Sequence, residues 1–377
     1  MIALIYIVAV IYLALITWLT VGWFRLPRCK RNAIEGDVFV SVLIPARNEE
    51  KDIINLLSDI KKQSYPNNMF EVIVIDDSST DSTYEIVRQS LQDSTLNNVI
   101  VRLEKKQKNL SPKKRALEKG VSLAKGELII TTDADCRVKE NWINSFVLEY
   151  KRKETAMISG PVTFYNNNTV FKKIQSLEFL SLIASGAGAI GNNTVLMCNG
   201  ANMAYSKKAF EKVGGYSGDE DFASGDDVFL MMKMRKYLGN EKVSFLKKRD
   251  AIVSTKAQNS LHDFYNQRIR WAAKTSGYKN LFVQAVAIVV FIMNLTILMT
   301  GITAFFFPLL LTPFIIILAV KTIVDFPILL FITTFTKQKE LLIFYPITQV
   351  LIIVYTVTIA FLSQISTFRW KDREFVK

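Results

Sequence analysis

The chain has few of the residues that build disulfide scaffolds and histidine metal centres. Its 377 residues include three cysteines, none of them in a CxxC pair, and one histidine. This scarcity excludes a disulfide framework and any zinc site that needs two histidines. Half of the residues are hydrophobic and 21% are charged. There is therefore ample apolar surface for a folded core, and a disordered chain is excluded.

The amino-terminal segment lacks charge altogether. Residues 2–24 contain no charged side chain. Four basic residues follow at once, namely Arg25, Arg28, Lys30 and Arg31. The run is long enough to cross a hydrocarbon core of about 30 Å at about 1.5 Å per residue. Trp23 and Phe24 stand where a signal peptide needs small residues, so we expect residues 1–24 to be a retained anchor followed by a cytoplasmic region.

The carboxyl-terminal part contains two more uncharged runs, residues 281–320 and 341–368. They predict a membrane region over 281–368 with two to three spans. Three spans after a cytoplasmic region would put the basic tail outside, against the positive-inside rule, so the number of spans and the side of the carboxyl terminus stay open. Lys321 and Asp325 share a helix face, and a buried ion pair is preferred to an ion pathway.

The net charge of +13 is compatible with nucleic acid, an anionic membrane face or a phosphate-bearing substrate. No basic–aromatic motif of a nucleic-acid-binding protein occurs in the sequence. The basic flanks of the membrane segments account for the charge better. We therefore expect a membrane protein without a nucleic-acid partner.

Between the membrane regions, short β-rich runs alternate with stretches of helical periodicity. The predicted strands are 38–46, 71–76, 98–103 and 127–135, and the predicted helices are 49–63, 79–91 and 111–124. This alternation predicts an α/β domain with a mostly parallel sheet and helices on both faces. Such sheets bind ligands at the carboxyl ends of their strands. The residues just past each strand are therefore the candidates for a site.

Acidic residues follow two of these strands. Asp76, Asp77 and Asp81 lie at or after the second strand, and Asp133 and Asp135 lie at the end of the fourth. Each group alone is equally compatible with turn and helix-cap chemistry. Together they favour a cation, because clustered carboxylates repel one another unless a cation or donor holds them. Oxygen ligands without a histidine or cysteine cluster favour Mg²⁺ or Mn²⁺ bound to a nucleotide diphosphate.

Two further motifs carry charged side chains. GDD at 225–227 puts carboxylates at the start of a helical run, where N-capping by Asp226 is an alternative interpretation. QRIRW at 267–271 lies in an amphipathic stretch just before the membrane. Its Arg270 can pair with phosphate oxygens and its Trp271 offers a flat face, although an Arg/Trp belt at the bilayer surface is the alternative.

The apolar stretch 169–191 is rich in small residues. It could line an acceptor groove at the membrane, and a packed helix is the preferred interpretation.

Seven motifs, in order, resemble those of the family 2 glycosyltransferases with the GT-A fold. They are VSVLIPARNEE (40–50), VIVIDDSSTDST (72–83), KKRALEKGV (113–121), TTDAD (131–135), CNGANMAYSKKAFEKVGGY (198–216), GDDVFL (225–230) and QRIRW (267–271). The chain is most similar to the membrane-bound branch with cellulose, chitin and hyaluronan synthases and with glycolipid or carotenoid glycosyltransferases. The resemblance covers roughly 38–275 and implies a GT-A fold for that part.

The resemblance implies a donor-binding role for residues of the first two motifs. Pro45, Ala46, Asn48 and Glu49 match the loop that cradles the nucleotide, and Asp77 matches the residue that contacts the nucleoside.

The next two motifs match further substrate- and metal-binding residues of such enzymes. Lys113 falls among the substrate-binding residues, and Asp133 and Asp135 match the DxD pair. The resemblance makes both carboxylates candidates for holding Mg²⁺ or Mn²⁺, with Asp135 favoured as the direct metal ligand.

The last two motifs match the catalytic and acceptor side. Asp227 matches the general base of the [E/D]D motif, and Asp226 stands where Glu is commoner. Gln267, Arg270 and Trp271 match the QxxRW motif, which lines the acceptor and diphosphate side in the family.

The resemblance implies an inverting transfer, in which an acceptor hydroxyl attacks the anomeric carbon and expels the nucleotide diphosphate. The donor is then a nucleotide-diphosphate sugar, with a UDP-sugar favoured, and the acceptor is a lipid or glycan in the membrane. Single transfer is favoured over processive polysaccharide synthesis because few spans make a thin channel. A membrane protein that binds a nucleotide sugar without catalysis is the alternative from another class, and the two acidic motifs argue against it.

The same resemblance implies an integral protein of a bacterial inner (cell) membrane. Its catalytic domain, residues 38–275, would face the cytoplasm. The sequence specifies neither the sugar, the acceptor, the oligomeric state nor a protein partner.

Overall fold

The computed structural model describes residues 2–27, 37–92, 94–104, 111–153, 155–217, 225–273, 280–365, 368–370 and 373–375. The basic residues Arg28, Lys30 and Arg31, which oriented the predicted anchor, lie outside these ranges. The chain divides into two compact units. The helical unit comprises Met1–Arg25, Asn166–Asn192 and Ala257–Lys377, and the sheet unit comprises Leu26–Tyr165 and Asn193–Lys256.

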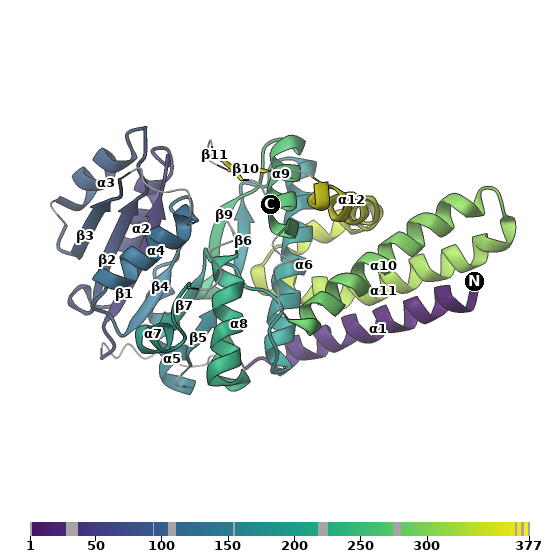
Figure 1. Ribbon diagram of the computed structural model, residues 1–377, viewed down its shortest axis with the longest axis horizontal. Helices are drawn as coiled ribbons and strands as arrows, with labels where there is room; N and C mark the ends of the chain where they lie inside the picture. The colour runs from purple at the N-terminus through teal and green to yellow at the C-terminus, as the bar shows by residue number, and fades with distance from the viewer. Residues whose placement is uncertain are drawn as a thin grey trace. The chain divides into compact units, whose positions relative to one another are not determined.

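The sheet unit is built on a seven-stranded sheet in the order β3-β2-β1-β4-β7-β5-β8 (Figure 1). Its strands are β1 (Val40–Ala46), β2 (Phe70–Asp76), β3 (Asn97–Arg102), β4 (Leu128–Thr131), β5 (Met157–Ser159), β7 (Met203–Ser206) and β8 (Val243–Phe245). Strands β1 to β4 are parallel to their neighbours among these four, whereas β7 is antiparallel to β4 and β5. A separate parallel pair consists of β6 (Val162–Tyr165) and β9 (Val253–Lys256). The predicted α/β class with a mostly parallel sheet is confirmed.

Three of the four predicted strands lie within two residues of their expected bounds. The fourth prediction was too long, because β4 ends at Thr131 and not at Asp135. Asp133 and Asp135 therefore lie in the loop that follows the strand. Side chains in a loop can turn toward a ligand, whereas successive strand residues point to opposite faces of the sheet.

The helices of the sheet unit are α2 (Ile53–Lys61), α3 (Thr83–Gln92), α4 (Pro112–Leu123), α5 (Trp142–Lys153), α7 (Lys207–Lys212) and α8 (Asp226–Leu238). Short 3₁₀ turns occur at Asn67–Met69, Asn240–Lys242 and Arg249–Ala251. The predicted helices at 49–63 and 79–91 both begin later than expected. Their first residues form the loops after β1 and β2, whose amides bond to side chains of the opposite loop.

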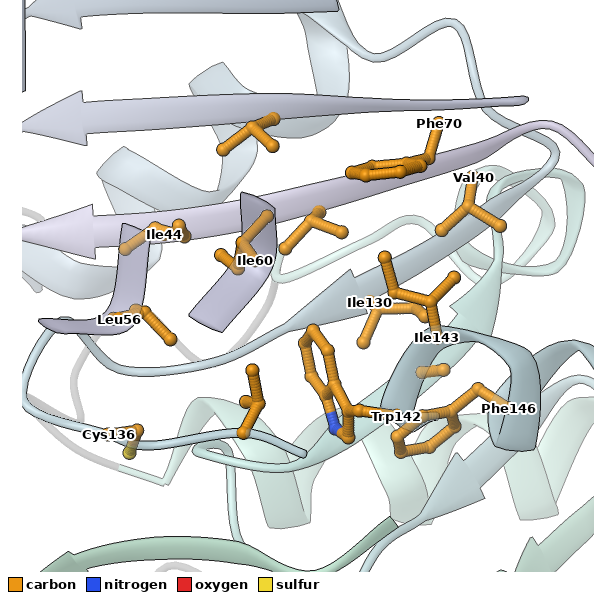
Figure 2. Packing of buried hydrophobic residues seen from close by; sticks show 14 of the residues in the cluster. Val40, Ile44, Leu56, Ile60, Phe70, Ile130, Cys136, Trp142, Ile143 and Phe146 are labelled. Carbon is orange, nitrogen blue, oxygen red and sulfur yellow. The ribbon is translucent and has the colours of Figure 1, made fainter. Parts of the chain in front are cut away.

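One hydrophobic core holds these loops in place (Figure 2). Val40 and Ile44 of β1, Phe70 of β2 and Ile130 of β4 are all fully buried in it. Trp142 of α5 packs into the same core, and its Nε1 donates to Asn202 Oδ1 at 2.9 Å. Each such apolar side chain contributes about 1.5–3 kcal/mol when buried. The strand ends that carry the acidic loops are therefore firmly anchored.

The helical unit consists of α1 (Ile2–Arg25), α6 (Val170–Gly191), α9 (Leu261–Ala273), α10 (Leu281–Ala304), α11 (Leu311–Thr336) and α12 (Tyr345–Ile365). It also contains 3₁₀ turns at Pro308–Leu310 and Lys339–Phe344 and a hairpin of β10 (Phe368–Trp370) and β11 (Arg373–Phe375). Helices α1, α10 and α11 lie side by side in Figure 1, whereas α12 is seen nearly end-on.

Among the residues that the structure describes, five segments are long and apolar enough to cross a membrane. They are Ile2–Arg25, Val170–Gly191, Leu281–Ala304, Pro308–Thr336 and Lys339–Ser363. Three of these helices lie in the carboxyl-terminal region. Helix α6 differs from the others, because Val170 is the one large hydrophobic residue that it exposes, whereas α1 and α10 to α12 each expose several. Its burial agrees with the preferred interpretation of 169–191 as a packed helix.

Glycine allows α1 and α6 to pack with their backbones in contact. A Cβ atom on Gly188 would lie 2.2 Å from the carbonyl oxygen of Leu19, and one on Gly22 would lie 1.9 Å from that of Gly188. Small residues at a helix crossing permit this approach in membrane proteins. Asn192 extends the contact, because its Nδ2 donates to Trp18 O at 2.6 Å.

The predicted ion pair between Lys321 and Asp325 is present on α11, with Nζ 2.7 Å from Oδ2. Lys321 also donates to Gln349 Oε1 of α12 at 2.6 Å, and Tyr12 of α1 donates to Asp325 Oδ1 at 2.8 Å. The pair therefore links three helices and satisfies its own charges. This arrangement fits the preferred structural interpretation.

Candidate active site

The loops after β1 and β2 are joined by hydrogen bonds. The amide of Asn48 donates to Ser79 Oγ at 3.0 Å, and the amide of Glu49 donates to Thr83 Oγ1 at 2.7 Å. Asn48 adopts a left-handed backbone conformation with φ of 52°, and its Oδ1 accepts the Thr80 amide at 2.9 Å. Asn and Asp tolerate this conformation better than most residues. The predicted nucleotide loop is thus a fixed turn.

Strand β1 ends in Pro45 and Ala46 beside Asp77, since the Asp77 amide donates to the Ala46 carbonyl at 2.9 Å. The Asp77 side chain is 6% exposed, and Arg115 Nη2 lies 2.7 Å from its Oδ1. Arg47 Nη1 donates to the Asp77 carbonyl at 2.6 Å. Two arginines therefore hold this carboxylate and its peptide in one orientation, as a nucleoside contact would require.

Asp76 and Asp81 have structural roles within the same loop. Asp76 Oδ2 accepts the Ser79 amide at 3.2 Å, and Asp81 Oδ1 accepts the Thr83 amide at 3.1 Å, where α3 begins. For these two residues the turn and cap interpretation holds.

A second cluster forms around Lys113 at the start of α4. Lys113 Nζ donates to Asp133 Oδ1 at 2.5 Å, and the Gly200 amide donates to Asp227 Oδ2 at 2.9 Å. A Cβ atom placed on Gly200 would lie 3.5 Å from Lys113 Nζ and 3.4 Å from Asp227 Cβ. The structure therefore brings Asp133, Lys113 and Asp227 together, although they come from three distant motifs.

The charges of this cluster are balanced around Lys113. Burial disfavours its ammonium form, but the nearby carboxylates of Asp133, Asp226 and Asp227 outweigh burial and raise the pKa of Lys113. Asp226 and Asp227 also occupy the first turn of α8, where the helix dipole favours negative charge. Gly225 precedes them with φ of 99° and takes the N-cap position that the alternative interpretation gave to Asp226.

Asp135 lies beside this cluster in sequence but has different partners. Thr255 Oγ1 of β9 donates to Asp135 Oδ2 at 3.2 Å. The adjacent Cys136 is fully buried, and burial together with the charges of Asp135 and Asp133 raises the pKa of its thiol. A thiolate nucleophile at Cys136 is therefore disfavoured.

The carboxylates fit a hard divalent ion that is shared with a substrate. Among the described residues there is no group of three or more His, Cys, Asp or Glu that would hold a metal by itself. Mg²⁺ usually binds through one or two carboxylates and completes its shell with water and substrate phosphates. Asp133 and Asp135 lie in one loop and supply two carboxylates for such an ion.

The QRIRW motif lies on α9, which belongs to the helical unit and not to the unit of the carboxylates. Gln267, Arg270 and Trp271 are all half-buried. Sequence reasoning missed Arg268, the second residue of this motif, which is 2% exposed and paired with Glu178 of α6. It also missed the roles of Arg115 and Gly200, although both stand in motifs that it had singled out.

Comparisons with known proteins agree with this architecture. The family model described as Glycosyl transferase family 2 matches residues 41–214, and the model described as Glycosyl transferase family group 2 matches residues 128–362. The second match covers more than half of the chain. Both include the loop of Asp133 and Asp135.

Two curated relatives indicate the range of the family. A β-monoglucosyldiacylglycerol synthase of Nostoc is 27% identical over 218 residues, which cover 57% of this chain and 45% of the relative. A poly-β-1,6-N-acetyl-D-glucosamine synthase of Staphylococcus epidermidis is 24% identical over 254 residues, which cover 66% of this chain and 56% of the relative. The chain thus spans about half the length of these relatives.

A solved structure shows the fold. A mannosyltransferase from Pyrobaculum calidifontis, solved in complex with GDP-Man and Mn²⁺, aligns with a TM-score of 0.55 at 18% identity. The alignment covers 94% of this chain and 96% of that one. With the family matches and the mostly parallel sheet, it shows that the chain belongs to the family 2 glycosyltransferases and has a GT-A fold joined to helices of membrane-spanning length.

Proposed function

We propose that the protein is an inverting glycosyltransferase that moves a sugar from a nucleotide-diphosphate donor to a hydroxyl group of a lipid in the membrane. The observation that carries the proposal is the cluster of Asp133, Lys113 and Asp227, which combines a diphosphate-side carboxylate with a candidate base. One relative is named for a glucosyldiacylglycerol product, and a neighbouring structure was solved with GDP-Man.

The donor would bind against the two joined loops. Pro45, Ala46, Asn48 and Glu49 would cradle the nucleotide, and Asp77 would accept hydrogen bonds from the nucleoside. The contacts of Asn48 with the opposite loop support this role, because a loop held rigid before binding loses little entropy when the donor arrives.

Asp227 would act as the general base. Its Oδ2 accepts the Gly200 amide, and its Oδ1 accepts the amide of Val228 at 2.8 Å. Two amides and the start of α8 stabilise the carboxylate and fix its orientation. It would take the proton of the acceptor hydroxyl as that oxygen attacks the anomeric carbon and the nucleotide diphosphate leaves. General base catalysis contributes about 10²–10⁴ in rate.

Asp135 and Asp133 would hold Mg²⁺ or Mn²⁺, which neutralises charge on the leaving diphosphate when bound. Lys113 already contacts Asp133 Oδ1, which supports Asp135 as the direct ligand. Lys113 lies where it would also attract phosphate oxygens. Gln267, Arg270 and Trp271 would serve the acceptor and diphosphate side, as the QxxRW resemblance implies.

Connectivity supports a membrane arrangement with three crossing helices. Helix α6 follows β6 and precedes β7, and both strands belong to the sheet unit. A single crossing by α6 would put these strands on opposite sides of the membrane, so α6 lies along the membrane surface. The hairpin strand β10 packs against α9, which follows β9 of the sheet unit.

Helix α12 therefore begins and ends on the side of the membrane on which α9 lies. Its steep inclination to α10 and α11 in Figure 1 supports an orientation along the membrane surface. With α1, α10 and α11 as the crossing helices, the carboxyl terminus stays cytoplasmic, and the basic tail then obeys the positive-inside rule. The sheet unit would then lie on the cytoplasmic side of a bacterial cell membrane.

Labelled nucleotide sugars test the proposed reaction. Membranes that contain the full chain would be incubated with labelled UDP-glucose, UDP-GlcNAc or GDP-mannose in the presence of Mn²⁺. Label that extracts into organic solvent supports transfer to a lipid, and label in high-mass material supports the processive alternative, which the match to a poly-N-acetylglucosamine synthase favours. No chain-dependent incorporation from any donor would contradict the proposal.

A further inference from the structure

A buried ion pair lies beneath the QRIRW helix. Arg268 Nη2 donates to Glu178 Oε2 of α6, and the two side chains are 2% and 7% exposed. Tyr355 of α12 donates to the other oxygen of Glu178 at 3.4 Å. The pair therefore connects the three helices of the helical unit that we propose to lie outside the membrane core.

Stability alone is a weak reason for such a pair. The loss of hydration of two buried charges offsets most of their attraction, and apolar side chains of equal volume often serve as well. The presence of this pair therefore suggests a second role for Arg268, and the other contacts of its guanidinium indicate what that role is.

Arg268 contacts two side chains of the QRIRW motif. Its Nη1 donates to Gln267 Oε1 at 2.8 Å, and its guanidinium carbon lies 4.2 Å from the centre of the Trp271 ring. Phe264 flanks the guanidinium as well, with its ring centre 4.7 Å away. A planar guanidinium with several donors can make these contacts while it pairs with Glu178, whereas a lysine ammonium cannot.

The bond to Gln267 determines which end of the amide is available. Because Oε1 accepts from Arg268, the NH₂ group of Gln267 points away from the ion pair and can donate to a ligand. The ring of Trp271 contacts both Arg268 and Phe179, whose ring centre is 5.9 Å away.

We propose that Arg268, anchored by Glu178, is a positioning residue of the glycosyl transfer. It orients the Gln267 amide so that its NH₂ group donates to the substrates, while the Trp271 ring packs against the same guanidinium. The proposal rests on the proposed function and adds to it a residue that acts through the motif and not on the reacting atoms.

The first experiment replaces Arg268 with lysine in the full chain. Transfer is measured in membranes with whichever of UDP-glucose, UDP-GlcNAc and GDP-mannose the wild-type chain uses. Arg268→Lys should keep the charge opposite Glu178 and should lower kcat at least tenfold. Arg152→Lys is the matched control, because Arg152 pairs with Glu149 on α5. The control should keep wild-type kcat, and an unchanged kcat in Arg268→Lys would overturn the proposal.

A double-mutant cycle separates positioning from general support of the fold. If Arg268 acts through Gln267, the variant with both Arg268→Lys and Gln267→Ala should have the kcat of Gln267→Ala alone. If the two losses multiply, Arg268 acts independently of Gln267 and the proposal is wrong.

Gln267→Glu provides a test that does not depend on how well Arg268 variants fold. The glutamate keeps an oxygen for Arg268 to bond but lacks the NH₂ group, so kcat should fall as far as in Gln267→Ala. Wild-type kcat in Gln267→Glu would show that Gln267 matters only as a partner of Arg268, and would overturn the proposal. If the wild-type chain transfers none of the three sugars, the proposed function itself fails.

Discussion

At the scale of single residues, the proposed active site depends on glycine as much as on charge. Gly200 has no side chain, and its amide bonds Asp227 while Lys113 lies close by. A methyl group there would make ordinary contacts of 3.4–3.6 Å with Asp227 and Lys113, whereas a branched side chain would collide with them.

We expect Gly200→Ala to retain most of the transfer activity and Gly200→Val to lose at least nine-tenths of it. The reason is that valine would push Asp227 and Lys113 apart without removing either charge. Steady-state transfer rates of the two variants check this. Equal rates would mean that the spacing between Asp227 and Lys113 is unimportant.

Asp135→Ala should weaken the Mn²⁺-dependent binding of the nucleotide diphosphate about 10–100-fold, the range for loss of a group that supports a metal site. The exposed pair of Asp37 and Lys151 offers a matched control, since Asp37→Ala removes a carboxylate far from the acidic loops in sequence. Titration calorimetry with UDP and GDP, with and without Mn²⁺, measures the effect. The same affinity in wild type and Asp135→Ala with Mn²⁺ present would rule out Asp135 as a ligand.

At the scale of helices and strands, local pattern predicted most of what the sheet unit contains. Strands β1, β2 and β3 were predicted to within two residues, because a buried parallel strand is a continuous apolar run. Helix α4 was also well placed, since Pro112 marks its first turn.

The local sequence pattern did not predict the features that depend on contacts between segments far apart in the chain. The late starts of α2 and α3 follow from bonds between the loops after β1 and β2, for example from the Glu49 amide to Thr83 Oγ1. The cluster of Lys113 with Asp227 depends on how α4 and α8 pack, which no local spacing records. Arg268 was missed because an arginine inside a charged motif looks like a surface residue until its burial is known.

The close packing of α1 against α6 also belongs to the scale of helices and strands. Gly188→Ala should destabilise the helical unit, because the new methyl group would lie 2.2 Å from the Leu19 carbonyl oxygen and the helices would have to separate. We expect a loss of about 1–3 kcal/mol, the usual cost of overpacking. Thermal unfolding of the detergent-solubilised chain measures it.

Ser185→Ala on the same helix is the control, since the hydroxyl of Ser185 bonds only to the Ser181 carbonyl one turn earlier. An unfolding temperature of Gly188→Ala as high as that of Ser185→Ala would contradict backbone contact between α1 and α6.

At the scale of the whole molecule, our proposal has fewer membrane crossings than hydropathy alone would give. Helix α6 and the segment Lys339–Ser363 are long and apolar enough to span a bilayer. The connections of α6 to β6 and β7, and the packing of β10 against α9, argue against crossing in both cases. The sequence left the side of the carboxyl terminus open, and our proposal of a cytoplasmic carboxyl terminus rests on these contacts.

The carboxyl terminus should therefore be cytoplasmic. A reactive cysteine added after Lys377 should be labelled by a membrane-impermeant maleimide in inside-out vesicles and not in intact cells. A cysteine in the loop between α10 and α11, at Leu309, should show the opposite pattern, because that loop lies at the other end of the crossing helices. Labelling of the terminal cysteine in intact cells would mean that α12 crosses the membrane.

We propose that the carboxylates around Lys113 form the catalytic centre of a sugar transfer, with Asp227 as the base. Asp227→Asn tests it most directly, because it removes the base but keeps the size and the hydrogen bond from Gly200. We predict that sugar transfer falls by about 10²–10⁴ while the affinity for the nucleotide diphosphate stays within about threefold of wild type. Wild-type turnover in Asp227→Asn would contradict the account.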